Sequence, residues 1–127
     1  MNHASILIVD DDEMIVHFFQ MILEEVGYVI STAYTGNEAI ERVREKKIDL
    51  AILDYKLTDM KGDTLAVKLK EINSQIHIVF ITGYSEIKDK ILGSNLSRFV
   101  VVKPIKEDKL IEIVELALNE KPIAVKA

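Results

Sequence analysis

The sequence lacks cysteine, a secretion signal and any long apolar run, and each absence narrows the classes of protein to consider. Without cysteine, disulfides, thiolate nucleophiles and zinc–thiolate sites are excluded, although no redox compartment is thereby identified. No stretch approaches the roughly 20 apolar residues of a membrane span. The first apolar run breaks at Asp10, so it does not resemble a signal peptide either. We therefore expect a cytoplasmic protein that does not enter a membrane.

Basic residues are also sparse, with 16 Lys and Arg against 21 Asp and Glu and a formal net charge of -5. They are scattered along the chain, whereas direct binding of nucleic acid requires concentrated positive charge. We therefore expect no direct contact with nucleic acid. The 127 residues suffice for one domain with a sizeable core. We place that core at about 5–118 and interpret 119–127 as a tail or the start of a linker.

Five short apolar runs alternate with segments of helical periodicity, which is typical of a parallel sheet covered by helices. The runs predict strands at 6–9, 28–33, 48–54, 76–82 and 99–102. The helical pattern predicts helices at about 12–26, 63–72 and 110–117. It also predicts a helix that follows a turn at 35–37 and a helix of about two turns that ends near Gly93. Right-handed crossovers then give an α/β, doubly wound, flavodoxin-like fold, with five helices and a sheet in the order 2-1-3-4-5.

Several of these strands end at residues suited to phosphate chemistry: Asp10 and Asp11, Asp54, Thr82, and Lys103. The carboxyl ends of parallel strands share one edge of the sheet, so these side chains are expected to meet there. Carboxylate oxygens suit a divalent cation, and an ammonium balances phosphoryl charge. Each residue alone has a simpler interpretation, such as a solvated helix start, a strand-end hydroxyl or a surface lysine. Together they predict a phosphoryl site.

Four blocks of sequence occur in order: Ile-Leu-Ile-Val-Asp-Asp at 6–11, Asp54 with Leu57 and Gly62, Thr82-Gly83, and Lys103-Pro104. In these blocks, across about residues 5–118, the chain resembles the receiver domain of bacterial two-component response regulators, the CheY-like superfamily. The resemblance implies that Asp54 is the phosphoacceptor and that Thr82 and Lys103 contact the phosphoryl group. It implies a Mg²⁺ site, with Mn²⁺ as an alternative, whose residues are Asp10, Asp11, Asp54 and the Lys56 carbonyl. It also makes the peptide bond before Pro104 a candidate cis bond.

The resemblance further implies a phosphodonor, either a sensor histidine kinase or a histidine phosphotransfer protein, and an output protein that is not identified. Apolar residues Met14, Ile15 and Phe18 are candidate docking residues, although Phe18 has the spacing of a core residue. Gly83 and Tyr84 are candidate modulators, and Tyr84 with Lys56 flanks the path of the water that would hydrolyse the phosphoryl group. The family's switch aromatic is replaced by Val100.

Three other functions remain open at this point. A magnesium-dependent phosphatase also uses an aspartyl-phosphate, but its Asp-x-Asp nucleophile follows the first strand, whereas Asp54 follows the third. A flavin mononucleotide carrier requires a phosphate loop after the first strand, where three aspartates would repel a phosphate. A receiver-like scaffold that is never phosphorylated is the third. We expect no enzyme activity beyond self-directed phosphoryl transfer and slow autodephosphorylation.

Overall fold

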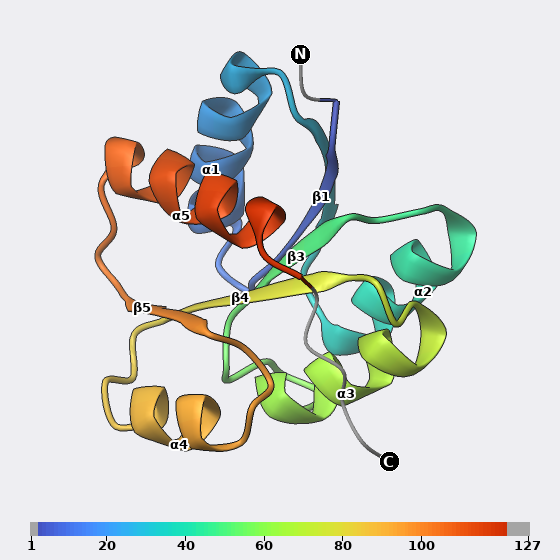
Figure 1. Ribbon diagram of the computed structural model, residues 1–127, viewed down its shortest axis with the longest axis vertical. Coiled ribbons are helices and arrows are strands. Elements are labelled where there is room, and N and C mark those ends of the chain that lie inside the picture. Colours follow the sequence, from blue (N-terminus) through green and yellow to red (C-terminus); the bar gives the residue numbers. More distant parts are fainter. Residues whose placement is uncertain (1–2, 122–127) are drawn as a thin grey trace.

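The computed structural model describes residues 3–121, in which strands and helices alternate along the chain (Figure 1). The strands are β1 (Ser5–Val9), β2 (Val29–Ala33), β3 (Leu50–Leu53), β4 (His77–Thr82) and β5 (Phe99–Val102). The helices are α1 (Glu13–Val26), α2 (Gly36–Glu45), α3 (Gly62–Ile72), α4 (Ile87–Gly93) and α5 (Glu107–Asn119). Among these helices, none is both long and apolar enough to span a membrane.

The five strands form one parallel sheet in the order β2-β1-β3-β4-β5, which confirms the predicted topology. At the carboxyl end of the sheet, Val9 pairs with Ala33 on one side and with Leu53 on the other. The residues that follow, Asp10 and Asp54, therefore leave adjacent strands at the same level. This is the switch point at which doubly wound sheets collect ligands.

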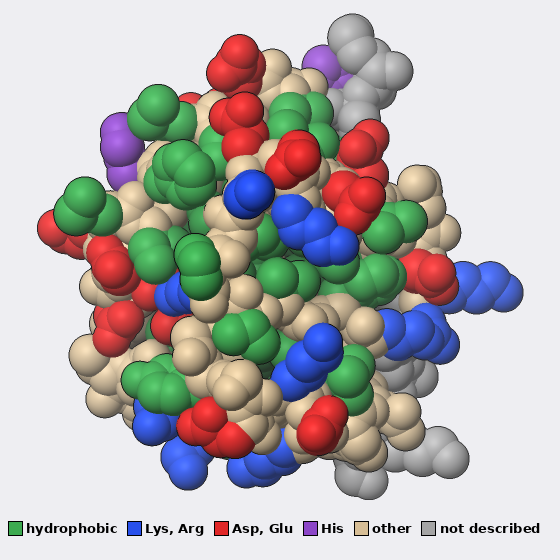
Figure 2. Space-filling model, turned by 90° about the vertical axis from the view of Figure 1, so that its left-hand side faces the viewer, with side chains coloured by type: hydrophobic (Ala, Val, Ile, Leu, Met, Phe, Trp, Pro, Cys, Tyr) green, Lys and Arg blue, Asp and Glu red, His purple; other side chains and the backbone are tan. Residues whose placement is uncertain are grey.

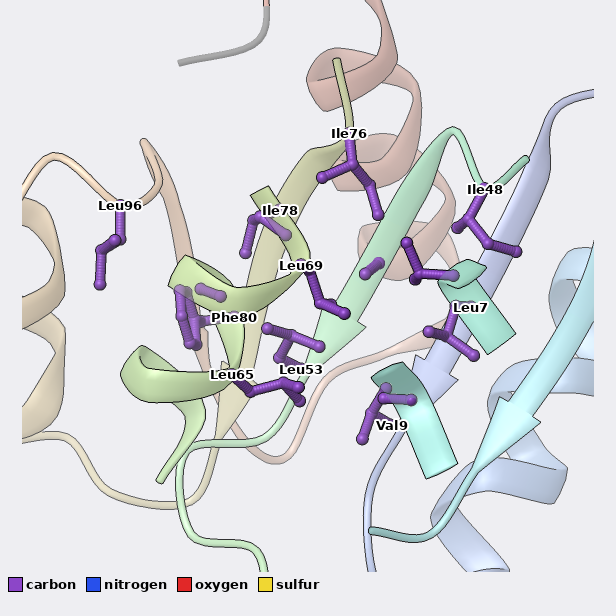
Figure 3. Close-up of a cluster of buried hydrophobic side chains, with 14 of the residues drawn as sticks. Leu7, Val9, Ile48, Leu53, Leu65, Leu69, Ile76, Ile78, Phe80 and Leu96 are labelled. Atoms are coloured by element: carbon purple, nitrogen blue, oxygen red, sulfur yellow. The ribbon is translucent and has the colours of Figure 1, made fainter. Parts of the chain in front are cut away.

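Two layers of helices cover the sheet, with α1 and α5 on one face and α2, α3 and α4 on the other (Figure 1). Successive residues of β1 supply both layers, since Leu7 packs into one apolar cluster and Ile8 into the other. In Figure 3, labelled side chains from the strands point toward Leu65 and Leu69 of α3. Burial of each such side chain contributes about 1.5–3 kcal/mol, so the two apolar layers hold the strand ends in place.

The element boundaries differ slightly from the sequence prediction. The turn predicted at 35–37 is the start of α2, because the Thr35 hydroxyl accepts from Glu38 N–H at 3.1 Å and caps a helix that begins at Gly36. The break predicted at Gly93 is confirmed as the end of α4. The helix at the carboxyl terminus extends through Asn119, where the tail was predicted to begin. The rest of that predicted tail, 122–127, lies outside the described residues.

Candidate functional site

Three aspartates converge at the carboxyl edge of the sheet. One carboxylate oxygen from each of Asp10, Asp11 and Asp54 lies within 4.8 Å of the other two. Asp10 and Asp54 are buried and Asp11 is exposed, so the cluster opens to solvent on one side. Oxygen ligands at this separation fit a hard divalent cation such as Mg²⁺, which keeps part of its water shell. The sequence prediction that these residues meet is confirmed.

Backbone contacts aim these carboxylates. Asp10 N–H donates to the Ala33 carbonyl at 3.2 Å and Asp54 N–H to the Val9 carbonyl at 3.1 Å, so both residues continue the sheet ladder past the strand ends. The Oδ1 atom of Asp54 then accepts the Tyr55 N–H at 2.7 Å. With one oxygen held in this way, the Oδ2 atom of Asp54 faces the site.

Lys103 reaches both buried carboxylates. Its Nζ lies 2.6 Å from Asp10 Oδ2 and 3.4 Å from Asp54 Oδ2. Its backbone N–H donates to the Thr82 carbonyl at 2.7 Å, and the Lys103–Pro104 peptide bond is cis, as the resemblance implied. The ammonium therefore enters the site from β5, across β4 from the two carboxylates that it contacts.

Burial and the neighbouring charges shift the pKa values of two residues in the site. Burial raises the pKa of Asp10, and the charge of Asp54 adds to that rise against the lowering effect of the Lys103 hydrogen bond. Burial alone would lower the pKa of Lys103, but its hydrogen bond to Asp10 and the charges of both carboxylates raise it above its ordinary value. The lysine is therefore held in its charged form. One ammonium does not balance the negative charge of the three clustered carboxylates, so the site favours binding of a cation.

Thr82 ends β4 fully buried, and its hydroxyl oxygen accepts the Tyr84 N–H at 3.3 Å. Among the described residues it makes no hydrogen bond to Asp54, so the structure places Thr82 at the site edge without joining it to the acceptor. Tyr84 is 36% exposed, and its ring stacks under Lys56, whose Nζ lies 4.2 Å from the ring centroid. Lys56 and Tyr84, the two residues expected to flank the path of the hydrolytic water, thus form one cation–π pair, which the sequence did not indicate.

Two further residues hold the loop after Asp54, and neither role could be inferred from local sequence. The carboxylate of Asp59 accepts Gly36 N–H at 2.8 Å and Asn37 N–H at 2.9 Å, so it caps α2 from 22 and 23 residues away. At Gly62, an added Cβ would lie 2.5 Å from the Asp54 carbonyl oxygen. Only glycine permits this approach, which folds the loop back against the acceptor.

An apolar groove borders the site. Ile15, Phe18 and Phe19 of α1 line it together with Lys103, Pro104 and Ile105. Phe18 is 47% exposed, so its alternative interpretation as a core residue is wrong. Met14 is 81% exposed and lines a neighbouring hollow with Asp11 instead. Figure 2, which views the side of the molecule carrying α5, shows several apolar side chains gathered between charged ones.

Comparisons with known proteins agree with this geometry. The Salmonella typhimurium transcriptional regulatory protein ZraR is 32% identical over 115 residues, which are 90% of this chain and 26% of ZraR. The uncharacterized transcriptional regulatory protein YkoG of Bacillus subtilis is 29% identical over 94% of this chain and 53% of its own length. The chain thus spans between a quarter and about half of these relatives.

Solved structures of response regulators also match this chain. A response regulator receiver domain protein from Methanospirillum hungatei matches with a TM-score of 0.86 at 29% identity, covering 93% of this chain and 95% of that chain. Response regulator protein TrrA from Thermotoga maritima, solved in complex with Mg²⁺–BeF, matches with a TM-score of 0.82 at 32% identity, covering 90% and 98%. The response regulator receiver domain profile matches residues 6–115, and the chain therefore belongs to this family of two-component systems.

Proposed function

We propose that Asp54 accepts a phosphoryl group from a phosphohistidine on a sensor histidine kinase or a histidine phosphotransfer protein. The observation that carries this proposal is the position of the Asp54 carboxylate, which lies between two further aspartates and the Lys103 ammonium. Receiver domains bind Mg²⁺ at such an acidic pocket and interact with histidine kinases and output domains. A nucleophile, a cation site and a fixed positive charge are the parts that phosphoryl transfer requires.

In this reaction a carboxylate oxygen of Asp54 forms a bond to phosphorus while the bond from phosphorus to the donor nitrogen breaks. The donor imidazole keeps the electron pair of that bond. Tyr55 N–H holds the Oδ1 atom of Asp54 at 2.7 Å, which orients the carboxylate for in-line attack. Lys103 moves its charge from Asp10 toward the phosphoryl oxygens, and the Thr82 hydroxyl donates to one of them.

Asp10, Asp11, Asp54 and the Lys56 carbonyl would hold Mg²⁺, with Mn²⁺ as an alternative. The cation supplies charge neutralisation at the phosphoryl oxygens. The chain's own contribution is to keep the carboxylates close before the cation binds, with the Lys103 charge as the counter-charge that limits their repulsion. We place the metal-binding and acceptor functions in one site because they share Asp54.

The apolar groove is the proposed docking surface for the phosphodonor, with Ile15 and Phe18 in the groove and Met14 beside it. An apolar helix laid into this groove would bring its phosphohistidine to the adjacent acceptor site. Ile15→Asp should then slow transfer from the cognate donor and leave labelling by acetyl phosphate unchanged. Met21→Asp, at an exposed position outside the groove, is the matched control. Equal loss with both donors would mean damage to the acceptor site.

Signalling would proceed without a buried switch aromatic. Val100 is buried on the α4 face, while Phe99 packs into the cluster on the α1 and α5 face, because neighbouring residues of a strand point to opposite faces of the sheet. We propose that Thr82 moves toward the phosphoryl group and that Gly83 and Tyr84 follow. The output is a contact with another protein or segment, in the cytoplasm, with no enzyme activity beyond self-directed phosphoryl transfer and slow autodephosphorylation. Nucleic acid would be bound only outside this domain.

Intact-mass measurement after incubation with acetyl phosphate and Mg²⁺ tests the assignment. One phosphate adduct is expected, and it should be lost in Asp54→Asn and in EDTA. Asp108→Asn, at an exposed carboxylate of α5 that is not part of the aspartate cluster, should label normally. An adduct that persists in Asp54→Asn, or that forms equally without a divalent cation, would show that the acceptor lies elsewhere. Absence of any adduct in the native protein would favour the scaffold.

A further inference from the structure

A second polar site lies at the opposite edge of the sheet, where β4 and β5 begin. It contains a cavity of about 20 Å³ between α3, these two strands and the end of α5. Its charged or titratable lining residues are Lys70, His77, Arg98, Glu120 and Lys121. A cavity of this size holds one water-sized group. Three cationic side chains therefore surround a space with a single carboxylate among the described lining residues.

Lys70 is the unusual member of this cluster. It is only 6% exposed, and within residues 3–121 its Nζ has no hydrogen-bond partner and no carboxylate within ion-pair distance. The lining carboxylate, Glu120, pairs instead with Arg98 at 3.6 Å. An ammonium buried without a partner is costly, and the protein normally supplies a counter-charge or hydrogen-bond acceptors. Burial lowers the pKa of Lys70, and burial together with the Lys70 charge lowers that of His77.

We propose that this cavity binds a small anion, one atom of which enters beside the Lys70 ammonium. The volume limits the entering group to a halide or to one oxygen of an oxyanion such as phosphate. The remainder of an oxyanion would lie at the rim, where Arg98 and Lys121 are exposed. The Arg98 guanidinium suits oxyanions because it presents several donors in one plane. This site is separate from the aspartate cluster, which lies at the other end of the strands.

The test is thermal unfolding in a metal chelator, with phosphate or chloride exchanged for gluconate at constant ionic strength. At about five times the dissociation constant, ligand binding should raise the native Tm by roughly 4 °C and then saturate. The rise should disappear in Lys70→Met. It should persist in Lys68→Met, which removes an exposed lysine from the same helix. A response to phosphate alone identifies an oxyanion site, and a response to chloride identifies a halide site.

A second measurement does not depend on the variants folding. The ring resonances of His77 in the native protein should shift saturably with the same anion, because this ring lines the cavity. The ring resonances of His17, on α1, serve as the control. Unchanged His77 resonances with no saturable rise in Tm, or an equal rise in Lys70→Met, would overturn the proposal and leave an interior water as the partner of Lys70.

Discussion

Lys103 and Lys70 lie at opposite edges of the same sheet, and their surroundings shift the lysine pKa in opposite directions. Burial lowers the pKa of Lys70, whereas two carboxylates more than offset burial at Lys103 and raise its pKa. Lys103 lies 2.6 Å from Asp10. Lys70 has no such partner within the described residues. Within the described residues, the acceptor edge therefore supplies its own counter-charge to the buried lysine, whereas the opposite edge supplies none to Lys70.

The largest expected effect comes from adding a methyl group at a glycine beside the acceptor, compared with the same change at a glycine away from it. Gly62→Ala, at the acceptor edge, should lower the free energy of unfolding by about 3 kcal/mol, because the new Cβ meets the backbone of Asp54 rather than a movable side chain. Gly93 ends α4, before the chain enters β5, and a Cβ added there has no neighbouring atom within 4 Å. Gly93→Ala should therefore leave the free energy of unfolding unchanged or raise it by roughly 0.5 kcal/mol. Urea denaturation of both variants measures this contrast, and equal destabilisation would contradict it.

Substitution of the two lysines should change stability with opposite signs. Lys103→Met leaves Asp10 and Asp54 without their counter-charge and should cost about 2 kcal/mol in metal-free buffer. Lys70→Met removes a buried charge that has no partner within residues 3–121, and it should stabilise the protein by about 1 kcal/mol in gluconate buffer. Denaturant titration at neutral pH measures both. Changes of the same sign would contradict the conclusion that Lys103 has a counter-charge and Lys70 has none among the described residues.

The pH dependence sharpens this comparison. Because folding raises the pKa of Lys103 above 10.5, its stabilising contribution is fully present below that pH and is lost only as pH rises through the folded value. Folding lowers the pKa of Lys70 below 10.5, so its penalty on stability is full below the folded pKa and is relieved as pH rises from that value toward 10.5. Between pH 7 and about 10, the loss of unfolding free energy caused by Lys103→Met should stay constant. The increase in unfolding free energy caused by Lys70→Met should become smaller over the same range.

The smallest expected effect concerns hydrolysis at the acceptor edge, and it rests on the proposed phosphorylation of Asp54. The Lys56–Tyr84 pair, 4.2 Å apart, would restrict a water approaching in line with the phosphorus–oxygen bond. Lys56→Asn and Tyr84→Ala should each speed loss of the phosphoryl group about threefold, or roughly 0.7 kcal/mol in barrier. Mass measurement after donor removal gives the decay. Lys61→Asn, at the other end of the loop, is the control, and identical decay in all proteins would refute the shielding.

Much of the acceptor site followed from sequence because each residue stands at the end of a locally apolar run. Strand periodicity placed Asp10 after β1, Asp54 after β3 and Lys103 after β5, and the topology rules for parallel sheets then brought these ends together. The family resemblance supplied the cis bond before Pro104, which no local pattern could have indicated. The element boundaries were predicted less accurately, as at α2, where Asp59 from a distant loop adds to the cap that Thr35 forms.

The amino-acid sequence by itself therefore determined the topology of this protein and the set of groups gathered at one edge of the sheet, because both follow from periodicities within short segments. Only the tertiary structure decided how those groups pair. It decided that Lys103 lies nearer to Asp10 than to Asp54, that Lys56 stacks on Tyr84, and that Lys70 is left without a partner among the described residues. Pairing depends on distances between side chains from separate elements, and packing sets those distances.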